Sequence, residues 1–270
     1  MAASLKARIQ TALVGIVVLA VVIGVGAPLL FPTLYLLLWL ASDELAAMLK
    51  HRNIALNPWL VKGWGFFVLV ASLPQLGPGP WREMAVGVGL LLAFLYELVF
   101  GANVPRLMAS VFALLYLPWT LGYALMLRYT PDGVWGLWSL ALPLLAAFAN
   151  DIGAFFVGRR WGRIKIAPEI SPNKTLEGSL GGFLSAFLAL LIISGGVHSR
   201  VQLSWLDVLG LSLLIALAAQ VGDLAESMLK RFAGVKDSGT LLPGHGGILD
   251  RLDSVLLTLP LTYYLVVMLP

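Results

Sequence analysis

The residues best suited to chemistry lie on two short stretches near the end of the 270-residue chain. On the first stretch, polar side chains recur at positions i, i+3, i+4 and i+7, namely Asp223, Glu226, Ser227 and Lys230. Residues with this spacing share one face of an α-helix. On the second stretch, Asp250, Asp253 and Ser254 repeat the i, i+3 and i+4 spacing. The sequence therefore predicts two helices that each present carboxylates along one side.

Carboxylates at this spacing predict a divalent metal site. The chain has no cysteine and only three histidines, and oxygen ligands alone are typical of Mg²⁺. Asp223 and Asp250 are the predicted metal ligands, because the loop between the helices can return the chain to one site. Each has another acid one turn away, at Glu226 and Asp253. The loop adds basic side chains and a glycine-rich bend at 243–247 whose N–H groups suit phosphate oxygens. We expect a site for a metal and a polyphosphate.

A second polar cluster precedes this one in the sequence. Asn150 and Asp151 end one apolar stretch, and the segment 171–178 opens the next. Ionisable residues at membrane depth are costly and usually face a cavity or a partner. An alternative interpretation is that these side chains lie at the membrane interface and extend to water. That interpretation fits isolated lysines and arginines better than it fits mixed charges crowded into one loop.

The stretch from Ser227 to Asp253 resembles the signature of the phosphatidate cytidylyltransferases, the CDP-diacylglycerol synthases. The resemblance runs through 27 positions without a gap: Ser227-x-Leu229-Lys230-Arg231-x4-Lys236-Asp237-x-Gly239-x2-Leu242-Pro243-x-His245-Gly246-Gly247-Ile248-x-Asp250-Arg251-Leu252-Asp253. Weaker matches precede it, Asp151-x-Gly153-Ala154-Phe155 and Ser171-Pro172-x-Lys174-Thr175-x-Glu177-Gly178. The chain departs from the family at Ile152, where a small hydroxyl residue is common. The resemblance covers about residues 150–254, the expected catalytic part of a single membrane domain over residues 1–270.

The resemblance implies transfer of CMP from CTP to phosphatidate, which releases pyrophosphate and forms CDP-diacylglycerol for phospholipid biosynthesis. The implied catalytic residues are Asp223, Asp250, Lys230 and Asp253, with Asp223 and Asp250 holding Mg²⁺. The residues implied to bind the nucleotide, the metal shell or the lipid headgroup are Lys174, Glu177, Arg231, Lys236, Asp237, His245, Gly246, Gly247 and Arg251. His245 is equally well explained as a residue held by its turn. Asp151 is a further candidate for the metal shell, and a homodimer is compatible with the family's architecture.

The elements that must position these residues are membrane helices. Hydrophobic residues make up 59% of the chain and charged residues 12%, with a mean hydropathy of +0.90. Soluble domains carry about a quarter charged residues, so a soluble enzyme, a secreted disulfide scaffold and a disordered chain are excluded. The net charge of +4 is not gathered on a basic helix, so we expect no nucleic-acid partner. The sequence predicts an all-α polytopic protein in the lipid bilayer of the cell (inner) membrane.

Hydropathy predicts nine spans, at residues 9–29, 31–50, 59–76, 83–100, 104–127, 134–158, 176–194, 203–231 and 248–269. The first is expected to be retained, because no Ala-x-Ala cleavage site follows it. Pro118 and Pro143 lie inside spans and are expected to kink them. Of the 18 lysines and arginines, only Arg82, Arg128 and Arg200 fall on one side of this topology. The excess of basic residues predicts a cytoplasmic N-terminus and active site, with the C-terminus outside.

The same polar residues also fit two other classes of membrane protein. A CTP-using lipid kinase, such as a polyprenol kinase, would share the metal and triphosphate chemistry but attack a different phosphorus. A secondary transporter or cation channel also uses intramembrane carboxylates, although its site is usually near the midplane and its chain usually carries repeats. Asp43, Glu44 and Glu97 are intramembrane acids, and pairing of Asp43 and Glu44 with Lys50 or Arg52 explains them equally well.

Overall fold

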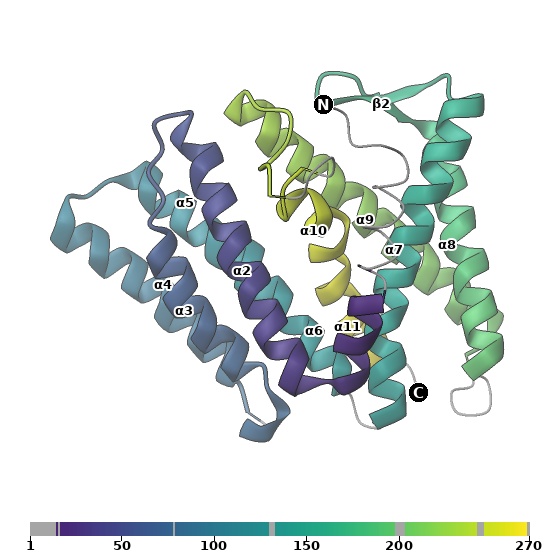
Figure 1. Ribbon diagram of the computed structural model, residues 1–270, viewed down its shortest axis with the longest axis horizontal. Helices are drawn as coiled ribbons and strands as arrows, with labels where there is room; N and C mark the ends of the chain where they lie inside the picture. The colour runs from purple at the N-terminus through teal and green to yellow at the C-terminus, as the bar shows by residue number, and fades with distance from the viewer. Residues whose placement is uncertain are drawn as a thin grey trace. The chain divides into compact units, whose positions relative to one another are not determined.

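A computed structural model describes residue 15 and residues 17–77, 79–129, 133–197, 203–241 and 246–268, and they are mostly helical (Figure 1). The helices are α2 (Ala27–Lys50), α3 (Pro58–Ala71), η1 (Pro74–Leu76), α4 (Trp81–Phe100), α5 (Val104–Leu114), η2 (Leu115–Trp119), α6 (Thr120–Arg128), α7 (Gly133–Trp161), α8 (Leu176–Val197), α9 (Trp205–Ala233), α10 (Leu249–Leu256) and α11 (Thr258–Met268). Two strands, β1 (Lys165–Ala167) and β2 (Ser171–Thr175), lie between α7 and α8.

The chain forms two compact units, the first from Met1–Met126 with Phe232–Arg251 and the second from Leu127–Arg231 with Leu252–Pro270. In the first unit, α2 packs on α3, α3 on α4, and α4 on α5. Close packing there depends on glycine, because a Cβ atom on Gly65 would lie 2.5 Å from Leu38 Cδ2. Asn57 begins α3 by accepting the N–H of Trp59 at 3.1 Å. The result is a set of neighbouring helices that presents one end of α2 to residues 238–249.

Pro118 lies in a π-helical segment, η2, between α5 and α6. Proline lacks the N–H that an α-helical turn requires, so the hydrogen-bond pattern must change around it. Thr120 Oγ1 donates to the carbonyl oxygen of Tyr116 at 2.6 Å within this segment. The hydrogen-bond pattern therefore changes at Pro118, whereas Pro143 lies within the continuous helix α7.

The second unit is built around α7, α8 and α9. Its core consists of small and branched residues from all three helices: Leu142, Ala146, Ala186, Leu190, Val208, Leu211, Ile215 and Ala216. Helices α7 and α8 approach closely, since a Cβ atom on Gly153 would lie 2.7 Å from the carbonyl oxygen of Gly181. Asn150, which is 1% exposed, accepts a hydrogen bond from Gln220 of α9 at 2.9 Å. These contacts hold together, in one unit, the parts of α7, α8 and α9 that carry the resemblance to the cytidylyltransferases.

The all-α prediction is wrong at residues 165–175, where β1 and β2 form an antiparallel hairpin. Lys165 pairs with Thr175 and Ala167 with Ser171. The segment is short and polar, so no hydrophobic period in the sequence marked its two strands. The hairpin lies at the end of α7 and α8 and places Lys174 beside α9 (Figure 1).

Six described helical stretches are long and apolar enough to cross a membrane: Ala27–Lys50, Trp81–Phe100, Val104–Arg128, Gly136–Trp161, Leu176–Gly195 and Trp205–Ala233. The other three expected spans differ. Residues 17–25 are helical and end at Gly26, whose φ of 81° breaks the helix before α2. Helix α3 has 14 residues, about 21 Å of rise, and the last expected span divides into α10 and α11. The chain is a multi-pass membrane protein.

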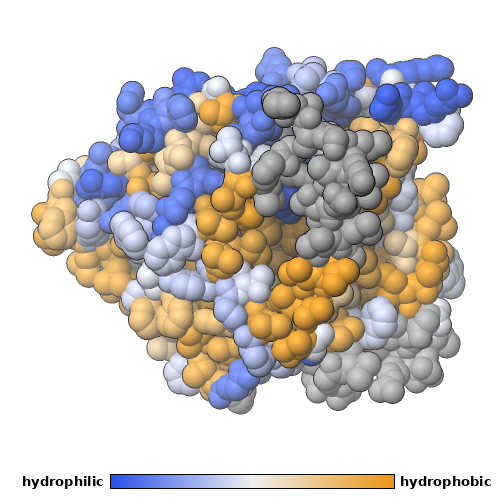
Figure 2. All heavy atoms as spheres, viewed as in Figure 1, coloured by the Kyte–Doolittle hydropathy of each residue, from blue (hydrophilic) through white to orange (hydrophobic). Residues whose placement is uncertain are grey.

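Exposed apolar side chains fit this conclusion. Leu98 on α4 and Ile192 on α8 are each 77% exposed. Orange, hydrophobic residues cover much of the flanks of the helices in Figure 2, whereas blue, hydrophilic residues gather over the hairpin. Apolar surface of this extent is stable when lipid covers it.

Candidate active site

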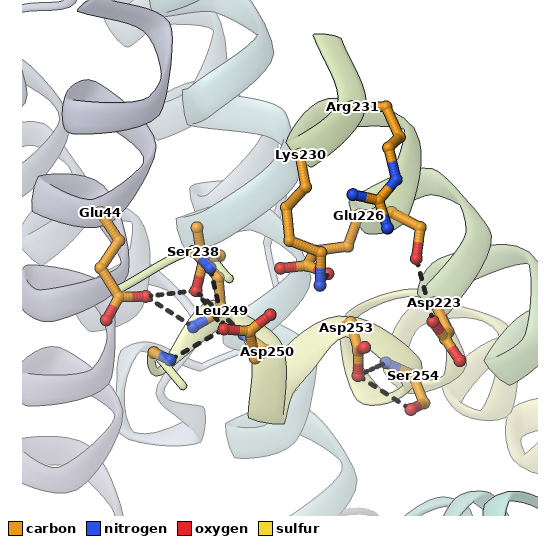
Figure 3. Close-up of polar contacts among 12 residues, drawn as sticks. Glu44, Asp223, Glu226, Lys230, Arg231, Ser238, Leu249, Asp250, Asp253 and Ser254 are labelled. Carbon is orange, nitrogen blue, oxygen red and sulfur yellow. Dashed lines mark hydrogen bonds and ion pairs between the residues drawn. The ribbon is translucent and has the colours of Figure 1, made fainter. Parts of the chain in front are cut away.

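Asp250 is held at the start of α10 by three hydrogen bonds to one carboxylate oxygen. Its Oδ2 accepts the N–H of Ser238 at 2.9 Å, the hydroxyl of Ser238 at 2.9 Å and the N–H of Gly247 at 2.8 Å (Figure 3). Gly246 adopts a φ of 79°, and a Cβ atom there would lie 2.5 Å from Asp250 Oδ2. The bend at 246–247 thus places backbone against Asp250, a role that its composition alone did not reveal.

Glu44 of α2 belongs to the same arrangement. Its carboxylate accepts the N–H of Ile248 at 2.8 Å, the N–H of Leu249 at 2.9 Å and the hydroxyl of Ser238 at 3.0 Å (Figure 3). The sequence placed Glu44 near a basic loop but gave no sign of this contact, because about 200 residues separate the partners. Sequence reasoning therefore missed it.

The expected local pairing of Asp43 with Lys50 or Arg52 is wrong. Asp43 binds Lys62 of α3 through both oxygens, at 2.7 and 2.8 Å. Lys62 is 3% exposed and lies over the rings of Trp39 and Trp59. Asp43 and Glu44, although adjacent in sequence, point to different partners because successive helical residues are about 100° apart.

In the second unit, Asp223 of α9 forms an ion pair with Lys174 of β2. Both side chains are about a quarter exposed, so the pair lies at the edge of the unit. Ser227 adds a long hydrogen bond to Asp223 at 3.4 Å. The two residues predicted from separate motifs, Lys174 and Asp223, are therefore brought together.

Glu226 and Lys230 form an i, i+4 ion pair one turn further along α9. The Glu226 side chain is fully buried and that of Lys230 is 12% exposed. Lys230 is thus directed at an acid of its own helix. This contact adds a structural role to the catalytic role expected for Lys230.

Two aspartates of the second unit are linked through Ser254. Its hydroxyl lies 2.9 Å from Asp151 Oδ2. The same hydroxyl lies 3.0 Å from Asp253 Oδ1, and the N–H of Ser254 donates to Asp253 at 2.6 Å (Figure 3). Asp253 lies on α10. The hydroxyl of Ser254 thus links an acid of α7 to an acid of α10.

The remaining predicted residues occupy varied positions. Glu177 accepts the N–H of Arg163 at 2.9 Å and that of Ile164 at 3.2 Å, which fastens the hairpin to α8. Arg231 donates to the carbonyl oxygen of Ile170 at 3.1 Å. Lys236, Asp237 and Arg251 are exposed beside the loop, whereas His245 lies outside the described residues.

The donor chemistry fits the predicted metal. Among the residues that the structure describes, no three or more of His, Cys, Asp and Glu gather as a metal cluster. Mg²⁺ needs only one or two carboxylates, because waters and substrate phosphates complete its shell. Asp223 and Asp250 belong to different units, so their joint ligation stays a prediction.

Comparisons with known proteins agree on one family. The family model described as "Cytidylyltransferase family" matches residues 6–269. A protein of Staphylococcus saprophyticus named phosphatidate cytidylyltransferase is 34% identical over 97% of this chain and 99% of its own length. Proteins of the same name from Staphylococcus aureus and Staphylococcus epidermidis are each 33% identical, with the same coverage. With the family model covering nearly its whole length, this chain belongs to the cytidylyltransferase family.

Proposed function

We propose that this protein transfers CMP from CTP to phosphatidate, giving CDP-diacylglycerol and pyrophosphate for phospholipid synthesis. The observation that carries the proposal is the unbroken signature from Ser227 to Asp253, in a chain whose relatives along its full length are named phosphatidate cytidylyltransferase. The hydrogen-bonded placement of Asp250 within that signature supports it.

The chemistry requires no nucleophilic side chain. An oxygen of the phosphatidate phosphate forms a bond to the α-phosphorus of CTP. The bond from that phosphorus to the oxygen that bridges to the β-phosphate breaks, and pyrophosphate leaves with the electron pair. The protein must therefore bring two polyanions together and stabilise charge on the transferring group.

The residues divide into two groups by charge. Asp223 and Asp250 are the proposed ligands of Mg²⁺, with Asp253 nearby on the same helix as Asp250. When bound, Mg²⁺ would supply positive charge to the phosphate oxygens. The basic side chains proposed to neutralise the triphosphate or the lipid headgroup are Lys174, Lys230, Arg231, Lys236 and Arg251. Gly246 leaves room for the Asp250 carboxylate, and the N–H of Gly247 donates to that carboxylate.

The proposal includes a topology of nine crossings. The excess of lysine and arginine on one side supports a cytoplasmic N-terminus and site, with the C-terminus outside the inner membrane. Under this proposal α3 and the pair α10 and α11 also cross or enter the bilayer. We propose a homodimer as the assembly, on the family resemblance alone.

The test uses purified protein, CTP labelled at the α-phosphorus, and phosphatidate in mixed micelles with Mg²⁺. We expect labelled lipid and unlabelled pyrophosphate. In a parallel reaction that also contains a lipid alcohol, label that stays in CDP, with the γ-phosphate passed to that alcohol, would identify a lipid kinase and overturn the proposal. Folded Asp223→Asn and Asp250→Asn variants should each lose CDP-lipid formation. Near-normal Mg²⁺-dependent turnover in either would refute the metal assignment.

A further inference from the structure

Glu44 of α2 contacts the start of α10 through backbone N–H groups. The N–H groups of Ile248 and Leu249 are among the first donors of α10, which have no acceptor within the helix. A carboxylate at this position both accepts these bonds and complements the positive end of the helix. Glu44 therefore fixes where α10 begins.

The signature is shaped to admit this carboxylate. A Cβ atom on Gly239 would lie 2.6 Å from Glu44 Oε1. A Cβ atom on Gly247 would overlap both Glu44 Oε2 and the hydroxyl of Ser238. A larger residue at either glycine would displace the Glu44 carboxylate. Two glycines of the loop therefore leave the space that this carboxylate from α2 occupies.

Ser238 connects Glu44 to Asp250. Its hydroxyl oxygen lies 3.0 Å from Glu44 Oε2 and 2.9 Å from Asp250 Oδ2, and it also accepts the N–H of Asp250 at 3.3 Å. A hydroxyl has one proton, so it donates to one of these carboxylates at a time. The position of the Ser238 side chain, and with it the bonds to Asp250, is thus set jointly by both acids.

We propose that Glu44 is a positioning residue that orients Asp250 for the reaction by holding Ser238 and the first turn of α10. The role of Asp250 in this inference rests on the proposed function. Glu44 itself touches no reacting atom under this proposal. It acts on Asp250 in the way that an outer hydrogen-bond partner orients a metal ligand, and loss of such a partner typically costs about 10- to 100-fold in metal affinity or activity.

The test compares Glu44→Gln with Asp43→Asn on the same helix. Asp43→Asn makes the matching acid-to-amide change but disturbs the pair with Lys62, away from the loop. We expect Glu44→Gln to lower kcat/KM by about 10- to 100-fold and to raise the Mg²⁺ concentration for half-maximal activity. Asp43→Asn should leave that Mg²⁺ concentration unchanged, whatever it does to thermal stability. Ser238→Ala should shift it as Glu44→Gln does, and the double variant should lose less than the product of the two single losses.

Hydrogen–deuterium exchange separates this inference from the proposed function. In Glu44→Gln, the amides at 246–252 should exchange faster than in the wild type, while Asp43→Asn should leave them unchanged. This readout needs no turnover, so it still tests the positioning role if the wild type makes no CDP-lipid. Unchanged exchange in Glu44→Gln, or an unchanged Mg²⁺ dependence in an active enzyme, would overturn the proposal.

Discussion

From the ion pair between Glu226 and Lys230, we predict that Lys230→Met lowers the stability of the folded protein, whatever its direct effect on catalysis. The Glu226 side chain is fully buried, and the substitution removes the ammonium group that it binds. Removing one partner of a buried ion pair typically costs about 3–5 kcal/mol, because the other charge is left in a poorly solvating environment. We expect the free energy of unfolding to fall by that order.

A second substitution separates stability from catalysis. Glu226→Gln in the same chain removes the negative charge while keeping nearly the same volume. The double variant should recover most of the stability lost by Lys230→Met, giving a coupling of about 2 kcal/mol or more in a double-mutant cycle. Thermal unfolding of the purified protein in detergent measures the four variants side by side.

The catalytic role of Lys230 can then be measured in the stable double variant, where loss of folding does not affect the activity. If Lys230 also neutralises the triphosphate or the headgroup, this variant should show a raised KM for CTP or phosphatidate. A Lys230→Met variant as stable as the wild type would refute this prediction, since buried Glu226 would then not need Lys230 for stability.

Two further predictions concern the loop and the topology. Lys236→Met should raise the KM for CTP or phosphatidate in steady-state assays, whereas Lys50→Met, also exposed, should not; equal kinetics in both would assign Lys236 to the interface. A reporter fused after Pro270 should be outside the cytoplasm and one inserted near Gly162 inside, and finding both on one side would refute the nine-span topology.

Local spacing allowed part of the site to be predicted. The i, i+3, i+4 and i+7 pattern on α9 correctly placed Lys230 beside Glu226, and Ser227 beside Asp223. These contacts are fixed by the period of one helix, so they need no knowledge of the rest of the fold. The long apolar stretches likewise indicated a multi-pass protein, because a span is a property of consecutive residues.

Contacts between distant segments were harder to predict. The pairs Asp43–Lys62 and Glu44–Leu249 depend on which helices pack together, and hydropathy does not specify this. The hairpin at 165–175 was missed because its short, polar sequence carries no hydrophobic period. The division of the last span at Leu257 is likewise not encoded in average hydropathy.

Glu44 and Glu177 show why residue type alone is an incomplete guide to function in this chain. Each accepts two consecutive backbone N–H groups, Glu44 from Ile248 and Leu249, and Glu177 from Arg163 and Ile164. Breaking these hydrogen bonds would leave backbone N–H groups without an acceptor, which is costly. Both acids therefore hold in place a loop that carries other charged residues. An acid that touches no reacting atom can therefore serve the reaction by fixing a loop, and its amide variant should change the loop's hydrogen exchange along with the rate.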